Sequence, residues 1–489
     1  MPNKIYIFAI GGTGSRVLRA FTMLMASGVK LPNGFDTVVP VIIDPDTANG
    51  DMNRTADILS KYQQIHSHVN RGTSFFSTTI KTLYQLLDDN APNITNHFKF
   101  NIEGASRDSF ADFIGYSSLD SDNKAFIDLL FTPKNLASEM SVGFKGNPNI
   151  GSIVLNQFTE SREYKEFAKS FNQGDAIFII SSIFGGTGAS GFPLLLKNLR
   201  THDPNIENSS LIKDSIIGAI SYLPYFKLAL PEGDNSEIDS SSFFMKAKAA
   251  LSYYDHSLFG NNSLNAFYYL GDNSNNNYEN HDGKAEQKNN AHFLELAGAL
   301  SILDFLTHIG VYATTDGKAE SVNYKEFGVE KDTRNIKFND LGNQVKAKIT
   351  KPLSKLMLLT SFLDKSLQKS LNSKDTWHKG AIHKDFFNHG FYQSEFLSFM
   401  KYFKEWVAEI KENDVAFEPF HENQDSKTLL NFINDYPQRK SLLSQKASDK
   451  KLVSKLNKIS KLLPAGTPEE KFFKLFDEAT ETIINKIIK

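Results

Sequence analysis

The chain has 489 residues, of which 40% are hydrophobic and 22% are charged, enough for two or more domains with substantial cores and too apolar for a disordered chain. Its formal net charge of −2 gives no overall basic field, so we expect no binding to nucleic acid through bulk charge. The absence of cysteine excludes disulfides, thiol catalysis and thiolate metal sites. No apolar run reaches membrane-spanning length, and the N-terminus enters a strand where a signal peptide would need an apolar helix. We therefore expect a soluble, cytoplasmic protein.

The first predicted elements are two strands, each followed by a segment that could contact a ligand. Lys4–Ile10 reads as a strand, ends in the glycine-rich segment Gly11–Ser15, and leads into an amphipathic helix. A second strand, Thr37–Ile43, ends at Asp44-Pro45-Asp46. A carboxylate at this edge of a parallel sheet can face a ribose, a base or a hydrated metal. Asp-Pro-Asp is also ordinary turn chemistry, so both interpretations stay open.

Residues 51–142 show helical and irregular patterns without a motif that compels a chemical role. They are followed by a second glycine-punctuated segment, Gly143–Gly151, and by a helical stretch. By itself this segment predicts only a loop.

The strongest local pattern is Ala176–Pro193. Ala176–Ser181 is a nearly continuous apolar run, typical of a strand buried on both faces, and the helical pattern that follows begins after glycines 185, 186 and 188. Glycine lets the backbone approach a ligand closely, and a helix N-terminus offers free N–H groups and about half a positive charge. This combination predicts an anion site with a phosphate group as its ligand.

Two more strands, Ser215–Tyr222 and Ala266–Leu270, complete the predicted sheet. They are followed by helical patterns at Ser241–Tyr254 and Ala291–Thr307, the second after a polar, asparagine-rich loop over 273–290. Strands alternating with helices predict an α/β fold with a doubly wound, mostly parallel sheet. We expect this domain to span residues 1–290, with a central helix over 291–310.

The remainder of the chain changes character. Residues 311–350 read as a connecting region with short strands, and residues 351–489 as a mainly helical C-terminal domain. Thr467-Pro468-Glu469-Glu470 is a strong helix start, with a capping Thr, Pro at the first helical position and Glu three residues after the cap. Lys450–Leu463 predicts a basic amphipathic helix that would suit a membrane surface or an acidic partner. A solvated face over a helical core is the favoured interpretation.

Two common nucleotide motifs do not fit the glycine loops. A P-loop needs Gly-Lys followed by Ser or Thr, but Gly283-Lys284 and Gly317-Lys318 are each followed by Ala. A dinucleotide fingerprint built on Gly12-Thr13-Gly14 would need a glycine where Val17 stands. The sequence therefore argues against a P-loop NTPase and weakens the Rossmann alternative.

An NAD(P)-binding oxidoreductase remains the runner-up. The spacing Gly185-x-x-Gly188-x-x-Gly191 is similar to that of short-chain dehydrogenases. Those enzymes place the glycines after their first strand and use a Tyr-x-x-x-Lys pair, in which the cation lowers the tyrosine pKa. That spacing occurs here at Tyr436 and Lys440, far beyond the predicted sheet.

In the order of its motifs, roughly the first 300 residues of the chain resemble the tubulin and FtsZ superfamily. Gly11–Ser15 is similar to the family's Gly-Gly-x-Gly loop, and Asp44–Asp46 to its short Asn-Thr-Asp segment. Gly143–Gly151 matches the Gly-x-Gly-x-x-Pro-x-x-Gly loop. Phe184–Ser190 resembles the Gly-Gly-Gly-Thr-Gly-Thr/Ser-Gly signature with the first and last glycines replaced, and Pro224 follows the next strand as in the family.

This resemblance implies a site for GTP or GDP, with a hydrated Mg²⁺ held through the nucleotide and water. The residues implied as nucleotide-binding are Gly11, Gly12, Thr13, Gly14, Ser15, Asp44, Asp46, Gly146, Asn147, Pro148, Gly185, Gly186, Thr187, Gly188, Ala189, Ser190 and Pro224. Backbone N–H groups would cradle the phosphates without a lysine. The central helix would meet the base near its start, through Asn290 or Glu295.

The family's assembly-dependent GTP hydrolysis uses an acidic Asn-x-Asp loop after the central helix. The nearest candidate here is Asn339-Asp340, which makes Asp340 the candidate catalytic residue, and a helix cap is the alternative interpretation. We therefore expect a divergent, prokaryotic-type tubulin-like GTPase that assembles head to tail into filaments. A non-polymerising nucleotide-binding module that presents its helical domain to a protein partner is the alternative.

Overall fold

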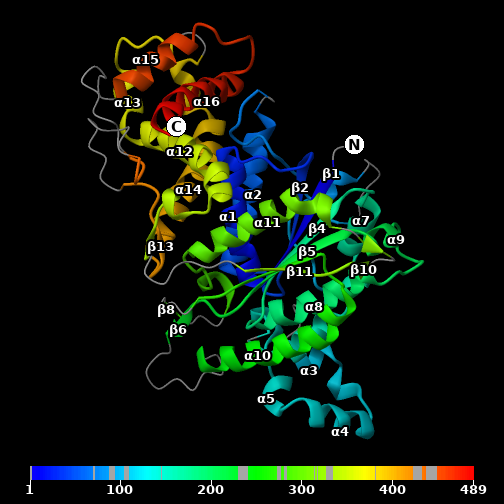
Figure 1. Ribbon diagram of the computed structural model, residues 1–489. Helices are drawn as coiled ribbons and strands as arrows, with labels where there is room; N and C mark the ends of the chain where they lie inside the picture. The colour runs from blue at the N-terminus through cyan, green and yellow to red at the C-terminus, as the bar shows by residue number, and fades with distance from the viewer. Residues whose placement is uncertain are drawn as a thin grey trace.

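A sheet of seven parallel strands forms the centre of the computed structural model (Figure 1). The strands of this sheet are β1 (Asn3–Ile10), β2 (Phe35–Ile43), β3 (Thr79–Ile80), β4 (Ala176–Ser182), β5 (Ile216–Tyr222), β7 (Ala266–Leu270) and β11 (Asn323–Glu326). Their order across the sheet is β11-β7-β5-β4-β1-β2-β3. The chain runs outward from β1 to β3, then returns to β4 and runs outward on the other side. This is the doubly wound topology predicted from the sequence.

The structure describes residues 3–69, 72–87, 94–103, 109–144, 146–229, 240–272, 277–279, 283–312, 314–315, 318–326, 334–379, 382–421, 432–436 and 449–488. Outside these ranges lie Lys145 of the second glycine segment, Lys440 of the Tyr-x-x-x-Lys spacing and parts of the polar loop over 273–290.

Helices cover both faces of the sheet. One face carries α1 (Gly11–Ser27), α2 (Gly50–Ser67) and α11 (Phe293–His308), and the other carries α7 (Arg162–Ser170), α8 (Gly186–Arg200) and α10 (Ser240–Ser257) (Figure 1). Successive side chains of a strand point to opposite faces of the sheet. Tyr6 and Phe8 of β1 contact Phe167 of α7 on one face. Phe178 of β4 contacts Phe305 of α11 on the other face. The predicted strands are confirmed, and the short edge strands β3 and β11 were not predicted to join the sheet.

Short helices lie between the strands, and those before residue 142 agree with the irregular pattern predicted over 51–142. They are α3 (Phe110–Phe113), α4 (Ser121–Leu130), α5 (Pro133–Leu136), α6 (Pro148–Leu155) and, before β5, α9 (Ser209–Lys213), with 3-10 turns at Tyr84–Leu86, Tyr116–Ser118, Met140–Val142 and Phe158–Glu160. Further 3-10 turns lie at Phe259–Asn261, Lys284–Glu286 and Ile309–Val311, and short strand pairs join β6 (Lys227–Ala229) to β8 (Asn277–Glu279) and β9 (Thr314–Thr315) to β10 (Lys318–Ala319).

The C-terminal region is mainly helical, as predicted, and lies over α1 and α2 (Figure 1). Its helices are α12 (Asn343–Lys365), α13 (Leu367–Leu371), α14 (Leu397–Glu409), α15 (Asp449–Ile459) and α16 (Pro468–Ile487), with a π-helical segment at Phe391–Phe396, 3-10 turns at Phe338–Asp340 and Lys384–Asn388, and the strand pair β12 (Asn335–Ile336) and β13 (Ala416–Phe417). The predicted start of α16 is confirmed, because Thr467 and Glu470 form a capping box with Pro468 in the first turn.

α15 and the apolar stretch around α11 bear on two expectations from the sequence. α15 buries Leu452 and Leu456 and packs on α16, which agrees with a solvated face over a helical core. By length and composition, Phe293–Val311 would be long and apolar enough to cross a membrane, with a mean hydropathy of 1.4, contrary to the expectation that no run reaches this length. Two thirds of this window is buried inside the fold, so it has the character of a core helix.

Candidate functional site

The carboxyl edge of the sheet gathers the segments that the sequence analysis singled out. Register pairs Ile10 with Ile43, Ala9 with Ile180 and Ser182 with Tyr222, so these parallel strands end side by side. Gly11 and Asp44 directly follow β1 and β2, and Gly185 and Pro224 lie three and two residues after the ends of β4 and β5. β1 and β4 are neighbours and form the point at which the strand order reverses, the usual ligand crevice of a doubly wound sheet.

The first glycine segment is the first turn of a helix, where a loop was expected. α1 begins at Gly11, whose φ of +73° suits glycine, and Ile10 at the N-cap offers no side-chain cap. A Cβ on Gly14 would lie 2.6 Å from the carbonyl carbon of Ala9, so only glycine lets α1 start this close to β1. The first N–H groups of α1 therefore point to the sheet edge without a partner in the helix.

The third glycine segment, Gly185–Gly188, repeats this arrangement beside it. α8 begins at Gly186, with Gly185 at the N-cap, no side-chain cap and no acidic residue in its first turn. A Cβ on Gly11 would lie 3.6 Å from the Cβ of Thr187, so the two helix N-termini approach each other closely. Two positive helix ends thus converge at one crevice.

The second glycine segment, Gly143–Gly151, packs against the third. A Cβ on Gly186 would lie 3.1 Å from the backbone nitrogen of Gly146 and 3.2 Å from that of Asn147. Asn147 is the N-cap of α6 and Pro148 its first residue. The Nζ of Lys246 on α10 donates to the Gly146 carbonyl over 2.9 Å. The structure therefore brings the three glycine segments together.

Three predicted site residues use their side chains elsewhere. Ser15 is fully buried, and its hydroxyl donates to the Gly11 carbonyl over 3.2 Å. The Ser190 hydroxyl donates to the Gly186 carbonyl over 2.7 Å. The Asp340 carboxylate accepts the Lys337 N–H over 2.7 Å and caps a 3-10 turn in the C-terminal region. Asp340 thus caps a turn, although not the start of α12, whose N-cap is Gly342.

Asp44 and Asp46 show the turn chemistry that was one of their two interpretations. Asp44 accepts the Asp46 N–H over 3.1 Å, and Asp46 accepts the N–H groups of Ala48 and Lys284. Both carboxylates are buried. Burial raises the pKa of Asp44 to about 7, with Asp46 and Asp51 adding to the effect. A carboxyl group that is only partly ionised at neutral pH therefore lies at this edge.

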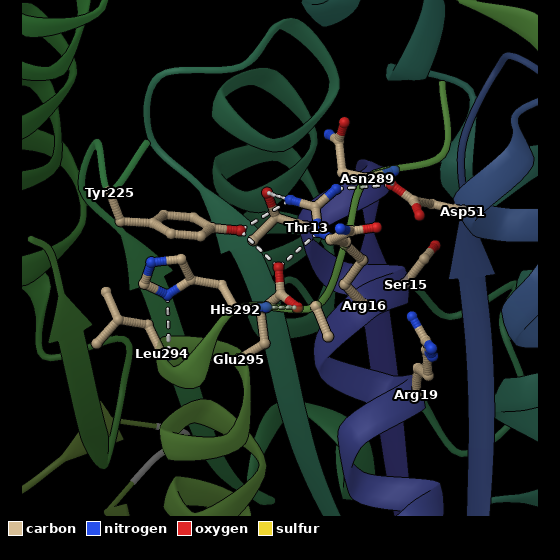
Figure 2. A network of polar contacts seen from close by, with 12 residues as sticks. Thr13, Ser15, Arg16, Arg19, Asp51, Tyr225, Asn289, His292, Leu294 and Glu295 are labelled. Carbon is tan, nitrogen blue, oxygen red and sulfur yellow. Dashed lines mark hydrogen bonds and ion pairs between the residues drawn. The ribbon is translucent and has the colours of Figure 1, made fainter. Parts of the chain in front are cut away.

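A buried polar network, not predicted from the sequence, lies directly beside the first glycine segment (Figure 2). Arg16 projects from α1 and donates to Glu295 over 2.5 Å, to Asp51 over 2.7 Å and to the Tyr225 hydroxyl over 2.8 Å. Its side chain is only 4% exposed. Burial alone would lower the pKa of Arg16, but Tyr225, Glu295 and Asp51 raise it well above its usual range.

Glu295 and His292 anchor this network at the start of α11. Glu295 accepts the His292 N–H, and His292 Nδ1 accepts the Leu294 N–H, which together form a capping box. Burial and the Arg16 charge lower the pKa of His292 to about 3, so this ring is neutral at physiological pH. Burial raises the pKa of Glu295 against the pull of Arg16. Of the two predicted base contacts, Glu295 is thus engaged inside the protein, while Asn290 is exposed and donates to Glu412.

The network continues into the C-terminal region. Arg54 bridges Asp51 and Glu409, and Arg19 donates to both oxygens of Glu409 over 2.7 and 3.2 Å. Three guanidinium groups thus face three carboxylates between α1, α2, α11 and α14. The only sequence signal was arginine on otherwise apolar helix faces, which does not identify partners as distant as Arg16 and Glu295.

Comparison with known proteins gives matches in structure alone. No protein-family model and no curated protein matches the sequence. The chain is similar to CetZ from Methanosaeta thermophila (14% identity, 64% of this chain and 52% of that chain, TM-score 0.28) and to GDP-bound CetZ1 from Haloferax volcanii (14% identity, 55% and 51%, TM-score 0.27). It is also similar to the GTPγS-form protofilament of TubZ from Bacillus thuringiensis (15% identity, 82% of each chain, TM-score 0.25).

The matches span about half the length of each CetZ chain. CetZ and TubZ are tubulin/FtsZ-family proteins, the superfamily that the sequence motifs resemble.

Proposed function

We propose that this chain binds a guanine nucleotide at the carboxyl edge of its sheet, with the phosphates between the N-termini of α1 and α8. One observation carries this proposal: two helices that begin in glycine, without side-chain caps, converge where the strand order reverses. Backbone N–H groups and aligned peptide dipoles at such a point favour a phosphate chain.

The residues present fit a phosphate group. The N–H groups of Gly11, Gly12 and Thr13 and those of Gly186 and Thr187 would bind phosphate oxygens. A Cβ on Gly11 or Gly12 would meet no protein atom closer than 3.5 Å. A hydrated Mg²⁺ would offset the remaining negative charge. Guanine is proposed from the resemblance of the motifs to the tubulin and FtsZ superfamily.

We further propose that the nucleotide-bound chain assembles head to tail into filaments and hydrolyses GTP in the assembled state. A non-polymerising binding module is the second candidate, and a specific observation favours it: Asp340 caps a turn beside Lys337, so its carboxylate already has a structural role. In that case the helical C-terminal region would be presented to a protein partner.

Nucleotide release and titration test the proposal. Denaturing the purified protein and separating the supernatant by ion exchange identifies any bound nucleotide, and titrations with GTP, GDP, ATP and NADH rank the ligands. We expect GDP or GTP in the supernatant and the tightest binding for guanine nucleotides. Binding of NADH alone would instead support the oxidoreductase alternative.

A pair of glycine variants localises the site. A Cβ on Gly12 would meet nothing closer than 3.5 Å, so Gly12→Ala should fold while placing a methyl group among the proposed phosphate donors. Gly390→Ala is the matched control, because a Cβ there meets no atom within 4 Å. We expect Gly12→Ala to weaken GDP binding at least tenfold and Gly390→Ala to leave it unchanged. Equal binding by both variants would place the nucleotide elsewhere.

A further inference from the structure

The segment that leads into the central helix is held by the C-terminal region. Residues 289–293 precede α11, and the Ala291 N–H donates to Glu409 over 2.7 Å. The Phe293 N–H donates to Oδ1 of Asn413 over 2.8 Å, and Nδ2 of Asn413 donates back to the Ala291 carbonyl over 3.2 Å. Residues 409–413, at the end of α14, thus supply hydrogen bonds to the backbone at the N-terminus of α11.

The same segment is connected to the first glycine segment through buried charges. Glu409 binds Arg54, Arg54 binds Asp51, and Asp51 binds Arg16. The Asp51 carboxylate lies 3.8 Å and Arg16 Nη1 lies 3.5 Å from the position that a Cβ on Gly12 would occupy. Every link is a charge-assisted contact of 3.1 Å or less between side chains that are at most 14% exposed.

This arrangement has an electrostatic consequence for an anion at the glycine segment. A phosphate beside Gly12 would lie close to the negative charge of Asp51. Asp51 is neutralised by Arg16 and Arg54, and Arg54 in turn is oriented by Glu409. If the C-terminal region were not docked, Arg54 would lose its ion pair with Glu409. The backbone N–H groups of Ala291 and Phe293 at the start of α11 would also lose their hydrogen-bond acceptors.

We infer that residues 409–413 are a positioning segment for the nucleotide site, so that nucleotide binding and docking of α14 stabilise each other. This inference rests on the proposed function and adds a coupling between the site and the C-terminal region. Coupling between two sites is reciprocal, so a nucleotide must tighten the docking of α14 by the same factor by which docking tightens the nucleotide.

Hydrogen exchange on the unmodified full chain tests the coupling in one direction. We expect saturating GDP to slow exchange of the Ala291 and Phe293 amides and of residues 397–413 at least fivefold, the lower end of typical coupling factors. Slower exchange confined to residues 11–15 and 185–190 would overturn the inference while leaving the proposed function intact. A chain that binds neither GDP nor GTP would overturn both.

A pair of asparagine variants tests the other direction without changing any charge. Asn413→Ala removes the acceptor and the donor at residues 291–293. Asn457→Ala is the matched control, because Asn457 accepts the N–H groups of Thr376 and Trp377 within the C-terminal region. We expect both variants to lower the melting temperature, but only Asn413→Ala to weaken GDP binding, at least fivefold. Equal GDP affinities for the two variants would show that residues 409–413 have a purely structural role.

Discussion

At the scale of single residues, Asp44 is a carboxylic acid in an unfavourable place for its charge. Burial raises its pKa from an ordinary 3.8 to about 7. When the pKa of an acid is higher in the folded than in the unfolded state, its contribution to the free energy of unfolding is fully present below the unfolded pKa. This contribution is lost as the pH rises through the folded pKa. Once Asp44 is fully ionised, the loss in the free energy of unfolding is on the order of 4 kcal/mol.

We therefore predict that the free energy of unfolding of the wild type falls between about pH 4 and pH 8, and that Asp44→Asn removes much of this slope. Asparagine keeps the oxygen that accepts the Asp46 N–H. Urea unfolding at several pH values measures the effect, and Asp122→Asn on the exposed α4 serves as control. Parallel pH profiles for wild type and Asp44→Asn would show that Asp44 ionises without penalty.

Arg16 is the residue on which the buried network depends. Arg16→Met leaves Glu295 without its cation and Asp51 with Arg54 alone, so we expect it to lower the free energy of unfolding by about 3–5 kcal/mol. The double variant Arg16→Met/Glu295→Gln should regain part of this loss, because Glu295 no longer brings an unpaired charge. Urea unfolding of both single variants and the double variant measures the coupling. Additive effects would contradict a direct Arg16–Glu295 interaction.

At the scale of elements, α1 can begin immediately after β1 only because its first turn lacks side chains. Gly14→Ala would place a Cβ 2.6 Å from backbone carbon, which cannot move aside as a flexible side chain can. We predict a loss of about 3 kcal/mol in the free energy of unfolding, at the upper end for overpacking. The Gly12→Ala variant, which meets no atom closer than 3.5 Å, should unfold close to the wild type. Similar stabilities for both variants would mean that α1 shifts away from β1.

The elements of the sheet could be predicted because each carries a local signal. β4 is a continuous apolar run, and the ends of β1 and β4 are marked by glycines that the close packing of α1 and α8 requires. The start of α16 follows from its capping box alone. β3 and β11 could not be predicted, because two and four residues are too few to show a strand period.

The network at the site could not be predicted for a different reason. Arg16 and Glu295 are 279 positions apart in the sequence, and Arg19 and Glu409 are 390 positions apart. Arginine among apolar residues, as in the first helix, indicates burial but does not identify a partner that lies hundreds of residues away. Ser15 shows the converse limit, since a serine in a glycine segment suggests a ligand contact but here bonds to its own helix.

At the scale of the whole molecule, the C-terminal helices lie over α1 and α2 (Figure 1). Besides aromatic contacts such as those of Phe76 with Phe399 and Phe473, two separate ionic clusters join these parts. One consists of Arg19 and Arg54 with Glu409, beside the first glycine segment. The other joins Lys355 of α12 to Asp477 and Glu481 of α16, and Asp477 accepts from Ser74. Because the two clusters tie the C-terminal helices to the α/β part at two places, we expect the chain to enter an assembly as one unit.

Assembly of the full chain is therefore the last prediction. If the proposed GTPase assembles head to tail, GTP should raise light scattering above a threshold protein concentration, and GDP should not. Gly12→Ala should abolish this rise at the same concentration, whereas Gly390→Ala should retain it, because only the first alters the proposed phosphate donors. A wild-type chain that binds GTP but never scatters would instead favour the binding module, and Asp340 would then be a turn cap with no catalytic role in a neighbouring subunit.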